Sequence, residues 1–112
     1  MKMTTMKINN AIVEIAIFTI KPDSINQVSE VRSKVKESLK SFKGFISINT
    51  LQPVNSSRVF ADIALWETLE DAHNAAKAFE EGDERFLPYM NCIEEIKFMG
   101  HFIENTNREE NL

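Results

Sequence analysis

Apolar residues show two kinds of pattern along this chain, one typical of strands and one typical of helices. Four segments are rich in β-branched and aromatic residues and are predicted as strands: 11–20, 45–52, 58–66 and 94–103. Between the first two strands, apolar residues recur every three or four positions, as on one face of a helix: Ile25, Val28, Val31, Val35, Leu39 and Phe42. A second helical pattern, rich in alanine, follows the third strand. The predicted order is therefore strand, helix, strand, strand, helix, strand.

Capping and turn residues fall at the expected element ends. Asp23 or Ser24 is predicted to cap the first helix and Gly44 to end it. Thr68, with Asp71 three residues on, resembles a capping box at the start of the second helix. A short turn-rich link joins the two central strands and predicts a hairpin, and a further short helix is expected over 84–91.

These elements predict an α+β, ferredoxin-like βαββαβ fold, with a four-stranded antiparallel sheet and two main helices on one face. We expect one domain over 11–104, because a chain of 112 residues has no room for a second core. The segments 1–10 and 105–112 lack such patterns and are predicted to be flexible termini.

The third predicted strand has two unlike faces. One parity is wholly apolar, whereas the other mixes aromatic residues with a carboxylate: Phe60, Asp62, Ala64 and Trp66. We assign the apolar parity to the face beneath the helices, with its counterparts on the other strands: Val13, Ile15, Ile17, Ile46, Ile48, Ala61, Ile63, Leu65, Ile96 and Phe98. The mixed face would then be too apolar for water, so we expect a second copy of the chain to cover it, forming a closed dimeric α+β barrel with a pocket between the sheets.

Polar residues on the mixed face are the candidates for chemistry. Those predicted to reach the pocket are Glu14, Asn49, Asp62, Lys97 and His101, framed by Phe18, Phe60 and Trp66. Glu14 or Asp62, paired with Lys97 or His101, would form either a buried or interfacial ion pair or a catalytic set. His101 beside a carboxylate could act as a general base. Trp66 could be a core residue or an aromatic platform.

Composition narrows the classes of function. The net charge is −4, with 13 basic and 17 acidic residues and no basic stripe, so a nucleic-acid partner is not expected. Lys34, Lys36, Lys40 and Lys43 are interpreted as a solvated helix face. The single cysteine, Cys92, is interpreted as a buried structural thiol and favours a reducing, cytoplasmic location.

Several other site types find no support in the sequence. The apolar run 11–20 is too short to cross a membrane as a helix, so no membrane association is expected. His73 is interpreted as a surface histidine. The sequence contains no zinc-ligand spacing, no glycine-rich phosphate loop and no nucleophile elbow.

Three segments make the chain resemble the antibiotic biosynthesis monooxygenase-like family of dimeric α+β barrels. They are 13–22, 42–45 and 62–76, the last containing Trp66 and the capped, alanine-rich helix, and the ending 99–102 resembles further members. The resemblance implies a homodimer with a cavity either between each sheet and its helices or inside the barrel. It also implies, for some relatives, oxygenation of phenols or quinols without a cofactor, after the protein deprotonates the substrate.

Other branches of the resemblance fit less well. Some oxygenase relatives have Asn where Asp62 stands, and an ionised acid cannot donate the amide hydrogen bond. Haem-degrading relatives share the Trp that matches Trp66, but their haem-ligating His falls where this chain has Ala76 and Lys77, with His73 about one turn earlier. Nothing in the sequence distinguishes the chemistry of a third branch, the muconolactone isomerases.

Two hypotheses follow. The first is a cofactor-independent monooxygenase-like enzyme acting on a small aromatic, with Asp62 or His101 as the proton acceptor. Here Glu14, Phe18, Asn49, Phe60, Trp66 and Lys97 would bind the substrate, and no cofactor or metal is expected. The alternative is a non-catalytic homodimeric module for small-molecule binding or assembly, because one fold hosts both kinds of protein.

Overall fold

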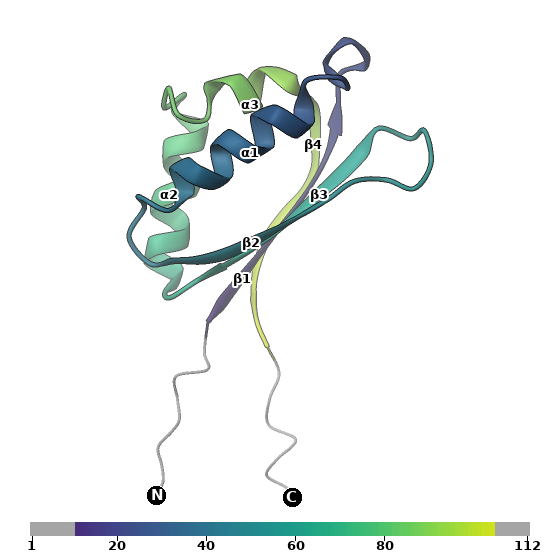
Figure 1. The fold of residues 1–112 in the computed structure, drawn as a ribbon. Helices are drawn as coiled ribbons and strands as arrows, with labels where there is room; N and C mark the ends of the chain where they lie inside the picture. Colours follow the sequence, from purple (N-terminus) through teal and green to yellow (C-terminus); the bar gives the residue numbers. More distant parts are fainter. Residues whose placement is uncertain (1–10, 105–112) are drawn as a thin grey trace, which may run out of the picture.

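The computed structural model describes residues 11–104 and contains one antiparallel sheet with helices on one side (Figure 1). Its elements are β1 (Ile12–Ile20), the 3₁₀ turn η2 (Pro22–Ser24), α1 (Val28–Leu39), β2 (Phe45–Leu51), β3 (Val59–Trp66), α2 (Leu69–Glu80), α3 (Leu87–Cys92) and β4 (Ile93–Ile103). The strand order is β2-β3-β1-β4, and every neighbouring pair is antiparallel. The predicted ferredoxin-like α+β fold is confirmed, whereas the predictions for 1–10 and 105–112 lie outside the described residues.

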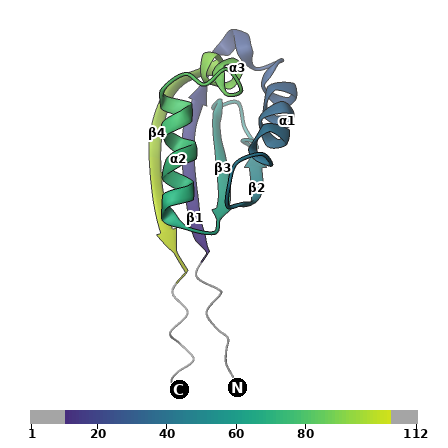
Figure 2. The same ribbon diagram turned by 90° about the vertical axis from the view of Figure 1, so that its left-hand side faces the viewer.

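The helices form a single layer over the sheet. Figure 2 shows α2 running along β4 and β1, while α1 lies on the side of β2 and α3 crosses one end. Figure 1 shows that the opposite face of the sheet carries no helix. The described chain therefore has two layers, and a side chain on the sheet faces either the helices or the open side.

Local sequence explains where most elements begin and end. The Thr68 hydroxyl accepts a hydrogen bond from the Asp71 backbone N–H at 3.0 Å, as predicted for the start of α2. Gly44 adopts a φ of +80°, which suits glycine at the turn into β2. The prediction that Asp23 or Ser24 caps the first helix is wrong. Those residues lie in the separate turn η2, and α1 begins at Val28 without a side-chain cap.

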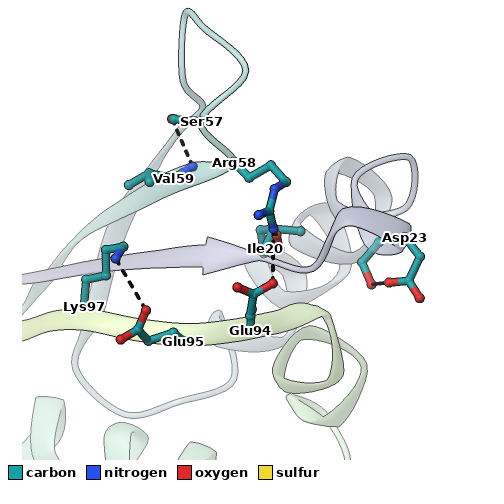
Figure 3. Close-up of polar contacts among 9 residues, drawn as sticks. Ile20, Asp23, Ser57, Arg58, Val59, Glu94, Glu95 and Lys97 are labelled. Atoms are coloured by element: carbon teal, nitrogen blue, oxygen red, sulfur yellow. Dashed lines mark hydrogen bonds and ion pairs between the residues drawn. The ribbon is translucent and has the colours of Figure 1, made fainter.

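Arg58 ties three strands together at the end of the β2–β3 hairpin. Its φ is +63°, an uncommon value for a residue other than glycine. Its guanidinium donates to the Ile20 carbonyl at 2.7 Å and to the Glu94 carboxylate at 3.1 Å (Figure 3). These bonds link the start of β3 to the end of β1 and the start of β4.

The assignment of sheet faces made from the sequence is wrong for β1 and β3. The mixed parity lies beneath the helices, where Phe18, Phe60 and Trp66 are almost fully buried in the core. Aromatic side chains bury more apolar area than Val, Ile or Ala, so this choice gives the larger hydrophobic gain. The polar groups on this face find partners there, as the site geometry below shows.

The open face therefore carries the uniformly apolar parity. Register places on it Val13, Ile15, Ile17, Ala61, Ile63, Leu65, Phe98 and Phe102. Phe98 and Phe102 remain 43% and 46% exposed. Because the mixed face is covered by the helices of the same chain, the expectation that a second copy covers it is also corrected.

Bulges interrupt the alternation on both flanking strands. The pairing of β2 with β3 shifts between Phe45 and Ser47, and that of β4 with β1 shifts where β1 passes from Ile17 to Phe18. As a result Ile48 and Ile96 face the helices, as predicted, whereas Phe98 faces the open side. A single parity cannot describe a bulged strand.

Candidate functional site

A cavity of about 100 Å³ lies between the sheet and the helices. Its walls are mostly apolar, and they include four alanines, two from the sheet and two from α2: Ala16, Ala64, Ala75 and Ala76. Three residues with polar ends also line it: Glu14, Asp62 and Tyr89. The small side chains leave space for a ligand, and the few polar groups can fix its orientation. Small-molecule sites are usually built in this way.

Glu14 is the centre of one polar cluster. Its Oε1 accepts a hydrogen bond from the Trp66 indole N–H at 3.1 Å, and its Oε2 lies 2.9 Å from His101 Nε2. The Glu14 and His101 side chains are only 13% and 17% exposed. The ring of His73, which is itself exposed as predicted, lies edge-on against His101 at 5.0 Å. Of the pairings that the sequence left open, the structure contains the one between Glu14 and His101.

Asp62 is the centre of the second cluster. Its Oδ1 accepts from an Arg32 guanidinium nitrogen at 2.5 Å, and its Oδ2 accepts from the Tyr89 hydroxyl at 2.5 Å. The same Arg32 nitrogen donates to the Ala61 carbonyl at 2.7 Å. Burial, reinforced by the negative charge of Asp62, raises the pKa of Tyr89 well above its ordinary value of 10.0. Tyr89 is therefore a hydrogen-bond donor at neutral pH.

Two residues of this cluster escaped the sequence analysis. As a charged residue outside the apolar set of the first helix, Arg32 is expected to face water, but it is only 7% exposed. A signal was present, because Arg32 stands four residues after Val28 and three before Val35, within the apolar stripe. Tyr89 follows Pro88 in a six-residue helix whose phase the sequence does not define.

The structure brings together most, but not all, of the predicted site residues. Glu14, Phe18, Asp62 and Trp66 line the cavity, and His101 reaches it through Glu14. Trp66 is 1% exposed, so it belongs to the core as well as to the cavity wall. Phe60 stacks on Phe18 at 6.5 Å between ring centroids and lies under Arg32.

Asn49 and Lys97 lie away from the cavity. Asn49 pairs with Ile63 on the open face, because the bulge in β2 changes the phase of that strand. Lys97 is exposed at the bulge of β4 and contacts Glu95 at 3.4 Å (Figure 3). The phase of a bulged strand thus decides which candidates reach the site.

Other site types receive no support within residues 11–104. No three His, Cys, Asp or Glu side chains come together there in a way that could hold a metal ion. In the same residues no helix has the length and apolar character needed to span a membrane. Cys92 is buried, as predicted.

Comparison with known proteins identifies similar structures. No family model matches the sequence, and no curated protein matches it. A proposed antibiotic biosynthesis monooxygenase of Bordetella bronchiseptica superposes with a TM-score of 0.74 at 13% identity, covering 87% of this chain and 99% of that one. A similarly described protein of Chloroflexus aurantiacus gives 0.66 at 11% identity, over 86% and 94%.

A third similar structure has a described activity. SnoaB, a cofactor-independent oxygenase of Streptomyces nogalater, matches with a TM-score of 0.58 at 15% identity, over 87% of this chain and 93% of its own. At such identities the likeness establishes the fold. The resemblance to the antibiotic biosynthesis monooxygenase-like proteins is thus confirmed, and the chain has their fold.

Proposed function

We propose that this protein is a cofactor-independent oxygenase acting on a small phenol- or quinol-like aromatic in the cavity between sheet and helices. The observation that carries the proposal is the Glu14–His101 pair beside an apolar cavity large enough to leave space unfilled. An apolar wall suits an aromatic ring, and a paired acid and imidazole can take up a proton. The likeness in fold to SnoaB supports the same reaction class.

We assign the proton-accepting role to the Glu14–His101 pair rather than to Asp62. Asp62 pairs with the Arg32 guanidinium, which is always charged, so protonating Asp62 would leave that buried charge without a partner. The partner of Glu14 is instead an imidazole, which can itself take up a proton. Glu14 lines the cavity directly and is held by the Trp66 indole and by His101. Asp62 is then a positioning residue, which orients the Tyr89 hydroxyl at the cavity wall.

The proposed reaction balances without a cofactor. The Glu14–His101 pair takes the proton of a phenolic hydroxyl, and the resulting electron-rich anion reduces O₂. For a phenol with an activated ring CH₂ group, as in an anthrone, one oxygen atom becomes the new carbonyl. The other leaves as water with the two hydrogens of the CH₂ group, so the substrate supplies all the electrons and the pair returns its proton.

The proposal includes a homodimer formed through the open face of the sheet, in a cytoplasmic setting. The apolar side chains of that face, among them Ile63, Phe98 and Phe102, would be covered by a second copy. The buried, unpaired thiol of Cys92 is in keeping with a reducing compartment.

The test is oxygen uptake by the purified protein with a panel of anthrones and quinols. We expect wild-type turnover with formation of a quinone, and a loss of roughly a hundredfold or more in Glu14→Gln and His101→Gln, because general-base catalysis contributes about that much. Lys97→Gln, an exposed residue outside the cavity, is the control and should keep full activity. If the folded wild type consumes no oxygen with any member of the panel, the enzyme proposal is abandoned.

The alternative, a non-catalytic binding module, has one observation in its favour. Glu14 and Asp62 are both satisfied by neighbours within the chain, as buried charges in a structural role would be. Under this alternative, aromatic ligands quench the fluorescence of Trp66 but are not converted. Glu14→Gln and His101→Gln then change only affinity or stability.

A further inference from the structure

A second hollow, of about 140 Å³, lies between α1 and strands β2 and β3. Six polar residues line this polar groove: Ser29, Arg32, Ser33, Lys36, Thr50 and Gln52. It is separate from the apolar cavity, and the two meet at the Arg32–Asp62 pair. Arg32 lines the groove, whereas Asp62 lines the cavity.

The side chains that line the groove favour a negatively charged ligand. Two of them are cations, three carry hydroxyls, one carries an amide, and none is a carboxylate. Such a set offers hydrogen-bond donors from several directions without repelling an anion. The surrounding chain is acidic overall, so the local excess of positive charge runs against the net charge of −4.

Arg32 supplies the more specific observation. It is more than nine-tenths buried, and its Nε–H has no hydrogen-bond partner in the part of the chain that the structure describes. Buried donors without a partner are rare, because each costs about 1 to 3 kcal/mol. The guanidinium is also held in place, by Asp62 on one side and by the Phe60 ring 5.2 Å away. Because Arg32 lines the groove, a ligand oxygen bound there is the partner that a small turn of the guanidinium would give this donor.

Lys36 supplies the positive charge that an anion in the groove would need. The charge of Arg32 is balanced by Asp62, so an anion needs a second cation. On the same helix Lys34 pairs with Glu30 and Lys40 pairs with Glu37. Lys36 takes part in no ion pair within residues 11–104 and lies at the groove.

We propose that the polar groove is a binding site for a small oxyanion, namely a phosphate, sulfate or carboxylate group, held by Arg32 and Lys36 and by the hydroxyls of Ser29, Ser33 and Thr50. The planar guanidinium and the ammonium group provide charge-assisted hydrogen bonds of the kind that bind such groups. The site does not depend on the proposed oxygenase activity, and its test requires no turnover.

Isotope-labelled protein titrated with sodium phosphate at constant ionic strength, with chloride as the reference salt, provides the test. We expect saturable shifts of the backbone amide resonances of Ser29, Ser33, Thr50 and Gln52. Lys36→Met should weaken binding about tenfold or more, since a charge-assisted hydrogen bond contributes about that factor. Lys34→Met, on the exposed and paired side of the same helix, should bind like the wild type. Arg32→Lys keeps the positive charge but loses the planar set of guanidinium N–H donors, so this variant should also bind phosphate more weakly.

Parallel titrations with phenyl phosphate and benzoate distinguish the source of the oxyanion. Tighter binding of phenyl phosphate than of inorganic phosphate places the anion on a larger molecule whose ring contacts Val28 or Phe60 at the groove wall. Equal or tighter binding of inorganic phosphate identifies the free ion. The proposal is overturned if none of the three anions gives saturable shifts, or if Lys34→Met weakens binding as much as Lys36→Met.

Discussion

Tyr89 is the residue whose chemistry the fold changes most clearly. Its hydroxyl donates to Asp62 at 2.5 Å, and its ring packs edge-on against Phe18 at 5.6 Å. Only 5% of the residue is exposed. A phenolate in this position would lack water and would face a carboxylate, so the folded protein holds the phenol in its protonated form.

This linkage predicts a pH dependence of stability. The folded pKa of Tyr89 lies above the unfolded value of 10.0, so the stabilisation is fully present below pH 10.0 and is lost as the pH rises beyond it, when the unfolded chain releases the proton. In urea unfolding, Tyr89→Phe should be less stable than the wild type below pH 10.0, by about 1 kcal/mol. The difference should shrink above pH 10.0. A difference that stays constant with pH would contradict the linkage.

Alternation along the strands grouped several residues that do gather around the cavity, although it also included Asn49 and Lys97, which do not. Glu14, Phe18, Asp62, Trp66 and His101 share one face because β1, β3 and the end of β4 keep a regular register. The position of Arg32 within the apolar stripe was a signal of burial, but the sequence did not show that the carboxylate of Asp62 makes this burial favourable.

Among the elements, the turn into β2 and the start of α2 depend on each other. The Glu67 N–H donates to the Gly44 carbonyl at 2.8 Å, and Thr68 caps the helix one residue later. A Cβ on Gly44 would lie 2.0 Å from Oδ2 of Asp71, a buried residue in the first turn of α2. The position therefore requires glycine for both space and backbone conformation.

Two glycine substitutions separate these requirements. Gly44 and Gly82 both have positive φ, of 80° and 79°, but a Cβ on Gly82 would meet nothing within 4 Å. Gly82→Ala should cost about 1 kcal/mol of unfolding free energy, for the backbone conformation alone. Gly44→Ala should cost clearly more, because Asp71 must also move. Equal losses in thermal or urea unfolding would show that the contact with Asp71 carries no energy.

The sequence predicted the order and type of the elements, but not the face that each strand turns to the helices. Both parities of β3 are apolar enough to be buried, so the pattern allowed two answers. The choice rests on the large rings of Phe18, Phe60 and Trp66, and on partners that come from distant segments. Bulges in β2 and β4 then broke the alternation, and no residue type marks them in the sequence.

For the molecule as a whole, the main feature is the open face of the sheet, which no helix within residues 11–104 covers (Figure 1). Large apolar side chains on this face, among them Phe98 and Phe102, are nearly half exposed. In the proposed homodimer they would be buried, and the mass in solution would be that of two chains.

A charge on the open face tests this assembly. Phe98→Glu should convert the protein to a monomer, measured by sedimentation velocity, because two buried carboxylates would face the interface without partners. Val54→Glu is the matched control, since Val54 is fully exposed in the hairpin loop and should leave the assembly unchanged. A wild type that sediments as a monomer at all concentrations would refute the dimer.

The four alanines around the cavity leave space that larger side chains would fill. Small side chains at buried positions usually lower stability, because the space they leave is not refilled by their neighbours. Exchanging Ala64 or Ala76 for a larger aliphatic residue is a small genetic step that would recover part of this loss. Such an exchange would also close the space that the proposed substrate needs, so a gain in stability would come with a loss of binding.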